Sequence, residues 1–111
     1  MTRSNIYQQL PNNLPDECFE VLLSQSNVRI ERIVSQGHSS PVGKWYDQSE
    51  NEWVIVLQGS AVIEYQDGKQ ITLKVGDYLY LPARLKHRVT STIENAHTIW
   101  LAIFWNDASI R

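Results

Sequence analysis

The segment SAVIEYQDGKQITL, residues 60–73, places an Asp67-Gly68 pair between two runs in which apolar and polar residues alternate. Aspartate followed by glycine favours the tight turn of a β-hairpin, because the central residues of that turn take positive φ angles. The alternation predicts a strand on each side of the turn, with one face toward a core. The segment therefore predicts a β-hairpin as the local unit of the fold.

The segments on either side repeat this pattern of short strands and close turns. EWVIVLQG, residues 52–59, is apolar, rich in β-branched residues and ends at glycine. Other short runs of this kind are NVRIERIVS (27–35), DYLYLP (77–82), KHRVTS (86–91) and HTIWLAIFW (97–105). Six to eight short strands without a convincing helix predict an all-β fold, an antiparallel sandwich or barrel.

The 111 residues suit a single domain with a real hydrophobic core. We expect residues 1–26 to form an N-terminal arm and a short element that pack on a barrel formed by residues 27–111. Within the arm, PDECFEVLLS (15–24) fits a short helix or a strand equally well, because its apolar residues match both periods.

Composition argues against several classes of function. Twelve acidic and ten basic side chains give a formal charge of −2 without a basic cluster, which speaks against nucleic acid and anionic membranes as partners. The single cysteine, Cys18, cannot form an intramolecular disulfide. No apolar run approaches the ~18 residues of a membrane helix. We therefore expect a cytoplasmic protein.

Two predicted strands, residues 53–57 and 98–105, are apolar on both of their alternating faces. A small barrel buries one face of each strand in its own core. The other face must be covered by a second sheet, by the N-terminal arm or by another subunit. We expect a homodimer.

A candidate site residue lies in GDYLYLPARLKHRV, residues 76–89. Pro82 ends one strand, and a short loop returns the chain so that His87 opens the next. With a period of two, His87 shares one face with Val89 and Ser91, opposite a basic and polar face, so we expect His87 to point inward. An inward histidine needs a hydrogen-bond partner, for which a backbone carbonyl or a carboxylate suffices.

Two spacings link these segments. Glu52 is followed by six residues and Gly59, and Gly76 is followed by five residues and Pro82, then by a short turn and His87. In this order they resemble the two motifs of the cupin family, across about half of the chain. The resemblance implies a cupin-type antiparallel β-barrel, also called a double-stranded β-helix or jelly roll, and a small-molecule ligand.

The resemblance also implies a candidate metal site with an unusual donor set. Metal-binding cupins carry His-x-His three or four residues before the glutamate, and this chain has WYDQ at residues 45–48 instead. Glu52 and His87 would bind the ion, with Asp47 or Gln48 in place of the absent histidines. One imidazole with oxygen ligands suits Fe(II), Mn(II) or Ni(II), and Zn(II) less well. No organic cofactor is implied.

The resemblance leaves three functions open. The first is a metal-dependent enzyme, a dioxygenase or isomerase that acts on a small polar molecule, in which Tyr46 or His38 moves protons. The second is a metal-free binding or sensing module without catalysis, in which Glu52 and His87 hydrogen-bond each other or a ligand. The third is a dimeric scaffold whose pocket is filled by side chains.

Overall fold

A computed structural model describes residues 3–12 and 14–107 of the chain. Its strands are β1 (Cys18–Gln25), β2 (Val28–Ser35), β3 (Asn51–Gln58), β4 (Ser60–Tyr65), β5 (Gln70–Lys74), β6 (Tyr78–Leu81), β7 (His87–Thr92) and β8 (Thr98–Trp105). The described residues contain no helix, so none that could cross a membrane. The all-β prediction is confirmed, and the segment that fitted either a helix or a strand provides β1.

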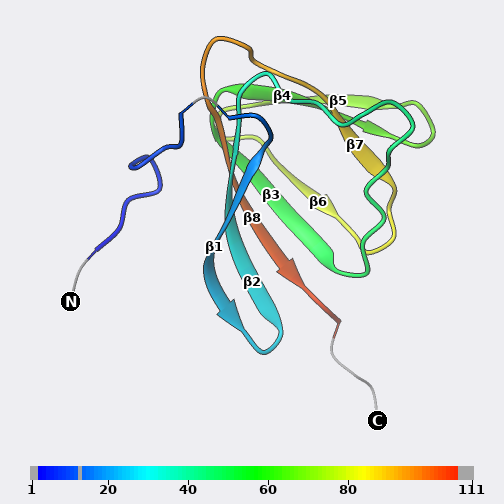
Figure 1. The fold of residues 1–111 in the computed structure, drawn as a ribbon. Helices are drawn as coiled ribbons and strands as arrows, with labels where there is room; N and C mark the ends of the chain where they lie inside the picture. The colour runs from blue at the N-terminus through cyan, green and yellow to red at the C-terminus, as the bar shows by residue number, and fades with distance from the viewer. Residues whose placement is uncertain (1–2, 13, 108–111) are drawn as a thin grey trace.

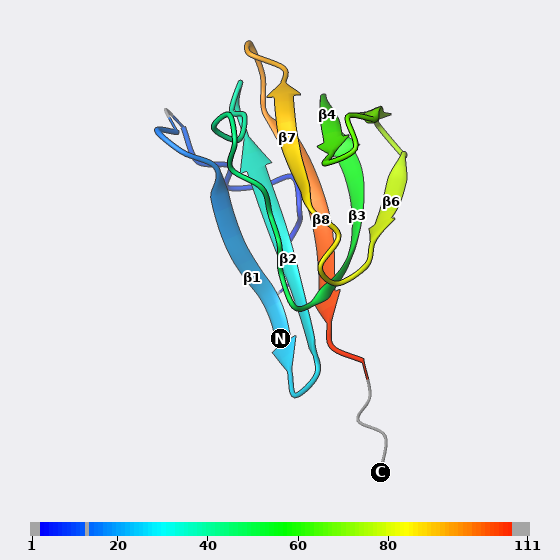
Figure 2. The ribbon, with the colours of Figure 1, turned by 90° about the vertical axis from the view of Figure 1, so that its right-hand side faces the viewer.

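The strands form two antiparallel sheets. The main sheet has the order β1-β2-β8-β3-β6, and the small sheet has the order β5-β4-β7. Figure 1 shows the small sheet gathered at one end, with the long strands of the main sheet extending away from it. In Figure 2, β7 lies in front of β2 and β8, so the sheets face one another. A shared core fills the space between them.

The predicted hairpin joins β4 and β5. Ile63 pairs with Ile71 at its centre, and Gly68 at the turn has a φ of 92°. The backbone N–H of Lys69 donates to Asp67 Oδ1 at 3.0 Å, an ordinary hydrogen-bond distance. The Asp67-Gly68 pair therefore forms the turn because glycine accepts the positive φ and aspartate bonds the backbone beyond it.

Gly59 lies where the chain leaves the main sheet at the end of β3 and enters the small sheet at β4. Its φ is 84°, and a Cβ atom there would stand 2.5 Å from Thr98 Oγ1 and 2.9 Å from Thr98 Cα. Any side chain would force the backbone of β8 to move. The glycine is therefore required by close packing as well as by backbone conformation.

The core consists of apolar side chains that the two sheets enclose. They come from β2, β3, β6 and β8 of the main sheet and from β4, β5 and β7 of the small one. The buried members are Ile33, Val54, Val56, Ala61, Ile63, Leu73, Leu81, Val89, Trp100, Ala102 and Phe104. The core holds the strands that carry the candidate site residues in fixed positions.

The inward face of β7 begins as predicted but changes before the strand ends. His87 and Val89 are buried, whereas Ser91 is exposed and Thr92 is buried in its place. The pairing of β7 with β4 shifts register between these positions, so one β7 residue has no direct partner. The prediction that Ser91 faces inward is therefore wrong, because a bulge breaks the period of two.

The N-terminal arm contacts the main sheet through its backbone. Arg32, a buried residue of β2, donates hydrogen bonds to the carbonyl oxygens of Gln8 at 2.6 Å and Ile6 at 3.1 Å. His97 Nε2 lies 2.9 Å from the carbonyl oxygen of Pro11. The arm is thus bound at several points along its length.

Candidate functional site

A cavity of about 410 Å³ lies between the two sheets, and we call it the cup. Its apolar wall is formed by core side chains of both sheets, with Phe19 from β1. The residues with polar groups that line it are Glu17, Arg29, Glu31, Tyr46, Gln48, Glu50, Glu52 and His87. The cup is therefore an open cavity lined by titratable and hydrogen-bonding side chains. A dimeric scaffold of the kind considered above would instead have a pocket filled by side chains.

Glu52 enters the cup from β3, where it pairs with Leu81 of β6 and Phe104 of β8. It is 7% exposed, and Gln48 Nε2 donates to its Oε1 at 3.0 Å. Burial raises the pKa of Glu52 to about 7, and the hydrogen bond from Gln48 opposes that rise. The side chain is therefore present in both its acid and its carboxylate form near neutral pH.

His87 enters the cup as the first residue of β7 and is 5% exposed. Its Nδ1 lies 2.9 Å from the carbonyl oxygen of Leu85, which can only accept, so Nδ1 carries the proton. Burial lowers the pKa of His87, although the hydrogen bond to Leu85 opposes this effect. The imidazole is accordingly neutral near pH 7, and its Nε2 presents a lone pair.

Glu52 and His87 lie side by side without a direct hydrogen bond. Glu52 Oε1 and His87 Nε2 are 3.8 Å apart, beyond hydrogen-bond distance. Burial shifts the pKa of each group toward its neutral form, so that the acid form of Glu52 has a proton to give and His87 has a lone pair to receive one. The arrangement can therefore bind a polar group between the two side chains or transfer a proton.

Arg29 is the one cation among the residues that line the cup, and its charge is matched by two carboxylates. Its Nε donates to Glu31 at 2.6 Å, and its two terminal nitrogens donate to Glu50 at 2.8 and 3.0 Å. The guanidinium also lies over the ring of Phe104, 4.5 Å from its centroid. These contacts fix Arg29 in place and leave it little capacity to bind an anion.

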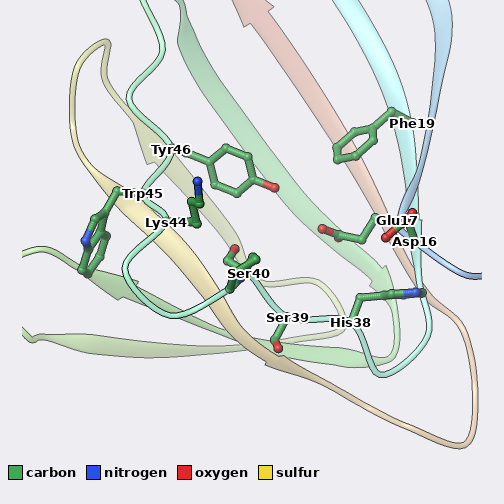
Figure 3. Close-up of a pocket in the computed structure, with 10 residues that line it drawn as sticks. Asp16, Glu17, Phe19, His38, Ser39, Ser40, Lys44, Trp45 and Tyr46 are labelled. Atoms are coloured by element: carbon green, nitrogen blue, oxygen red, sulfur yellow. The ribbon is translucent and has the colours of Figure 1, made fainter.

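Tyr46 lies at the boundary between the cup and a second pocket of about 390 Å³, the mouth pocket, which also shares Glu17 and Phe19 with the cup. Figure 3 shows the Tyr46 phenol pointing toward Glu17 and Phe19 across this opening. Burial, followed by the charge of Glu17, raises the pKa of Tyr46. Its hydroxyl therefore keeps its proton near neutral pH.

The loop before β3 sends alternate residues in opposite directions. Tyr46 and Gln48 line the cup, whereas Asp47 is exposed and lies 3.6 Å from Arg84. Of the two predicted substitutes for the motif histidines, the structure brings Gln48 to Glu52 and His87 and leaves Asp47 outside.

His38 lines the mouth pocket and is not among the residues that line the cup. The backbone N–H of Gln36 donates to His38 Nδ1 at 2.8 Å, so His38 Nε2 carries the proton and donates to the carbonyl oxygen of Leu14 at 3.2 Å. Both ring nitrogens have a backbone partner. His38 thus joins the arm to the loop, and its role in proton transfer stays a prediction.

Four charged residues of the cup were not predicted: Glu17, Arg29, Glu31 and Glu50. Arg29 and Glu31 alternate with Val28 and Ile30 in β2, and a strand with such an alternation ordinarily turns its charged face to water. A signal was present, because Ile33 continues the face of Arg29 and Glu31 into the core. Glu50 precedes β3 in a loop, where no periodicity indicates its direction.

The donor set of the cup does not fit a tightly held metal ion. It provides one imidazole, one carboxylate and the amide of Gln48, whose N–H group is directed at Glu52. Within residues 3–12 and 14–107, no three His, Cys, Asp or Glu side chains converge on a point where an ion could bind. Catalytic zinc sites have three protein ligands, and so does the triad of two histidines and one carboxylate that holds non-haem iron.

Comparison with known proteins identifies the family. The family model described as "Cupin domain" matches residues 32–104. A crystal structure from Ralstonia eutropha JMP134, named as a putative mannose-6-phosphate isomerase, is 39% identical with a TM-score of 0.91, covering 96% of this chain and 100% of its own.

Two further structures share the fold. A cupin superfamily protein from Desulfitobacterium hafniense DCB-2 is 22% identical with a TM-score of 0.72, over 88% of this chain and 84% of its own. An RmlC-like cupin from Methanocaldococcus jannaschii, with a double-stranded β-helix fold, is 17% identical with a TM-score of 0.69, over 88% and 87%. Among curated proteins the search found no match. The chain belongs to the cupin family.

Proposed function

We propose that the protein binds a small polar molecule in the cup through Glu52 and His87, without a tightly held metal ion. The observation that carries this proposal is the pairing of two buried titratable groups, 3.8 Å apart, in a cavity of about 410 Å³. That volume falls within the range of ordinary ligand sites, and an apolar wall with a few polar groups is their usual composition.

Protein-observed NMR with a library of small alcohols, amines, acids and sugars tests this proposal. We expect ligands to perturb the His87 ring and the Trp100 indole, because both line the cup. Glu52→Gln should weaken the binding of such ligands at least tenfold, whereas Glu64→Gln, outside the cup and bonded to Arg88, should not change it. A library without a single ligand that perturbs the cup would refute the proposal.

Isomerisation by proton transfer is a second candidate function. It is favoured by the acid of Glu52 beside the lone pair of His87, and by the name of the Ralstonia structure. Such a reaction removes a proton from one carbon and delivers it to a neighbouring one, which needs a base and an acid. Incubation with mannose and mannose 6-phosphate in D₂O should then place deuterium at C1 of the ketose product and, by the reverse reaction, at C2 of the aldose, and neither Glu52→Gln nor His87→Gln should do so. If neither sugar incorporated deuterium, isomerisation of these two substrates would be excluded.

A divalent Fe, Mn, Ni or Zn ion, and the dioxygenase or isomerase activity it would support, stay predictions. Their support is that Glu52 and His87 occupy the motif positions and that Gln48 lies beside them. Elemental analysis of protein purified without chelator is expected to find less than one equivalent of each metal. A stoichiometric ion would overturn the metal-free proposal.

We also propose that two chains associate through the outer face of the main sheet. One row of directly paired residues crosses all five strands and contains no charge: Tyr80, Trp53, Ile103, Ile30 and Leu23. Ring pairs flank it, with Tyr78 5.4 Å from Trp53 and Trp105 5.9 Å from Tyr80. An uncharged apolar row of this kind is self-complementary, as a two-fold interface requires. Light scattering should give the mass of a dimer at micromolar concentration.

The expectations from the sequence about nucleic acid and cellular location stay predictions. The net charge of −2 supports the expectation that the protein does not bind nucleic acid, which a gel-shift titration checks. A cytoplasmic location is checked by cell fractionation.

A further inference from the structure

When Glu52 is in its carboxylate form, the free polar atoms that Glu52 and His87 present to the cup are hydrogen-bond acceptors. His87 donates through Nδ1 to Leu85, and its Nε2 has no hydrogen-bond partner among residues 3–12 and 14–107, although its side chain is only 6% exposed. Glu52 Oε1 receives one hydrogen bond, from Gln48, and Oε2 receives none from the part of the chain that the structure describes. A ligand that matches these atoms must bring N–H or O–H groups, because acceptors do not bind acceptors.

The charge of the cup also favours a ligand that donates hydrogen bonds, and specifically a cation. Four carboxylates line it, Glu17, Glu31, Glu50 and Glu52, and Arg29 is the one cation among the lining residues. Because Arg29 already binds two of these carboxylates, its positive charge is balanced within the wall of the cup. The field inside the cup is therefore negative, which attracts cations and repels carboxylates and phosphates.

Neighbouring basic residues do not reverse this field. Arg88 donates to Glu64 at 2.8 Å, and Arg84 lies 3.6 Å from Asp47. Lys44 lines the mouth pocket together with Asp16 and Glu17, so two carboxylates accompany it there. Figure 3 shows Lys44 beside Tyr46 in the mouth pocket.

The rest of the cup suits the apolar part of an organic cation. Phe19, Tyr46, Trp100 and Phe104 contribute aromatic surface, and aliphatic core residues contribute the remainder. Aromatic faces attract a cation within ~6 Å of the ring centroid, and they also pack against its apolar body. Such a wall would add little to the binding of an inorganic ion.

We propose that the cup takes a small molecule with a protonated primary amine, whose ammonium group donates to both Glu52 and His87 while its apolar part contacts the aromatic wall. The two acceptors are 3.8 Å apart, so one nitrogen can lie ~2.9 Å from each of them. This inference rests on the proposed binding function and deepens it by naming the class of ligand. It also implies that a phosphorylated sugar is a poor ligand for this chain.

A matched series of probes with one body and three charges tests the proposal. Benzylamine, benzyl alcohol and benzoate share a ring and differ in the group offered to Glu52 and His87. We expect NMR titration at pH 7.5 to show benzylamine perturbing the Trp100 indole with an affinity at least tenfold above that of the alcohol, and benzoate binding weakest. Equal affinities, or tightest binding of the alcohol or benzoate at the cup, would overturn the amine proposal and leave the binding function intact.

Variants separate the charge of the cup from its shape. Glu52→Gln keeps the size of the side chain and should reduce benzylamine affinity at least tenfold, with less than a threefold change for benzyl alcohol. His87→Gln should weaken benzylamine binding as well, and thermal unfolding checks that both variants fold. The matched control Glu64→Gln should keep the wild-type order. If Glu52→Gln kept the wild-type preference for benzylamine over benzyl alcohol, the amine proposal would be wrong. If no probe bound in the cup of the wild type or of any variant, this result would count against the binding function too.

Discussion

The two faces of the main sheet differ in chemistry although they belong to the same strands. On the inner face, Arg29, Glu31 and Glu52 stand among core residues and line the cup. On the outer face, the neighbouring positions Ile30 and Trp53 belong to a row without charge. A sheet exposed to water on one side usually shows the reverse, with polar residues outside. The difference supports the two proposals made above, a ligand in the interior and a second chain on the outer face.

The largest expected effect breaks the outer face. Ile103→Asp places a charge in the middle of the apolar row, and burying an unpaired carboxylate in an interface is strongly unfavourable. We expect the dimer dissociation constant to rise at least ~1,000-fold, equivalent to about 4 kcal/mol. Sedimentation equilibrium measures it. The matched control is Thr72→Asp at an exposed position of β5, which should leave the dimer unchanged. A wild-type monomer, or an unaffected Ile103→Asp dimer, would show that this face has another role.

A smaller effect concerns the inner face and depends on pH. The folded-state pKa of Glu52, about 7, lies above the value of 4.5 expected in the unfolded chain. The stability that this group contributes is therefore present below pH 4.5 and is lost as pH rises through about 7, by on the order of 3 kcal/mol in total. Glu52→Gln carries no proton to lose, so its stability relative to wild type should be higher at pH 8 than at pH 5.

Urea unfolding at pH 5 and pH 8 measures this change, and the comparison between variants matters because His87 acts in the opposite sense. Burial lowers the pKa of His87, so its contribution is present above 6.5 and is lost on acidification. Glu64→Gln, outside the cup, serves as the control. A constant difference between wild type and Glu52→Gln at the two pH values would contradict the burial of Glu52 in the cup.

The smallest expected effects distinguish the two sides of the loop before β3. Gln48→Leu removes the hydrogen bond that opposes the rise in the pKa of Glu52, so that pKa should move above 7. Asp47→Leu removes an exposed carboxylate 3.6 Å from Arg84 and should change stability by less than ~0.5 kcal/mol. Carbon-13 NMR of the Glu52 carboxyl group follows the first change. A larger change in the pKa of Glu52 from Asp47→Leu than from Gln48→Leu would show that Asp47, and not Gln48, is the residue of this loop that acts on Glu52.

Much of the fold was predictable from local signals. The Asp67-Gly68 hairpin and the alternating strands identified an all-β chain, and the spacing to Gly59 and Pro82 identified the family. The order of strands in the two sheets was not predictable, because it depends on pairings between segments far apart in the sequence. The bulge that buries Thr92 instead of Ser91 was also hidden, since nothing in KHRVTS marks a change of period.

The candidate site was predictable only in part. Spacing identified Glu52 and His87, and the structure places both in the cup. The choice between Asp47 and Gln48 was undetermined because they lie outside a strand, where no alternation fixes direction. Arg29 and Glu31 were missed because a strand that is apolar on one face and charged on the other ordinarily turns its charges to water.

The contact between Arg32 and the N-terminal arm has a consequence for how freely the arm can vary. Arg32 donates to the carbonyl oxygens of Ile6, Gln8 and Gln9, groups that every amino acid possesses. The guanidinium therefore recognises the path of the arm's main chain and is indifferent to its side chains at these three points. A change of side chain at these three positions should therefore leave the contact intact, whereas loss of the Arg32 guanidinium should remove all three hydrogen bonds at once.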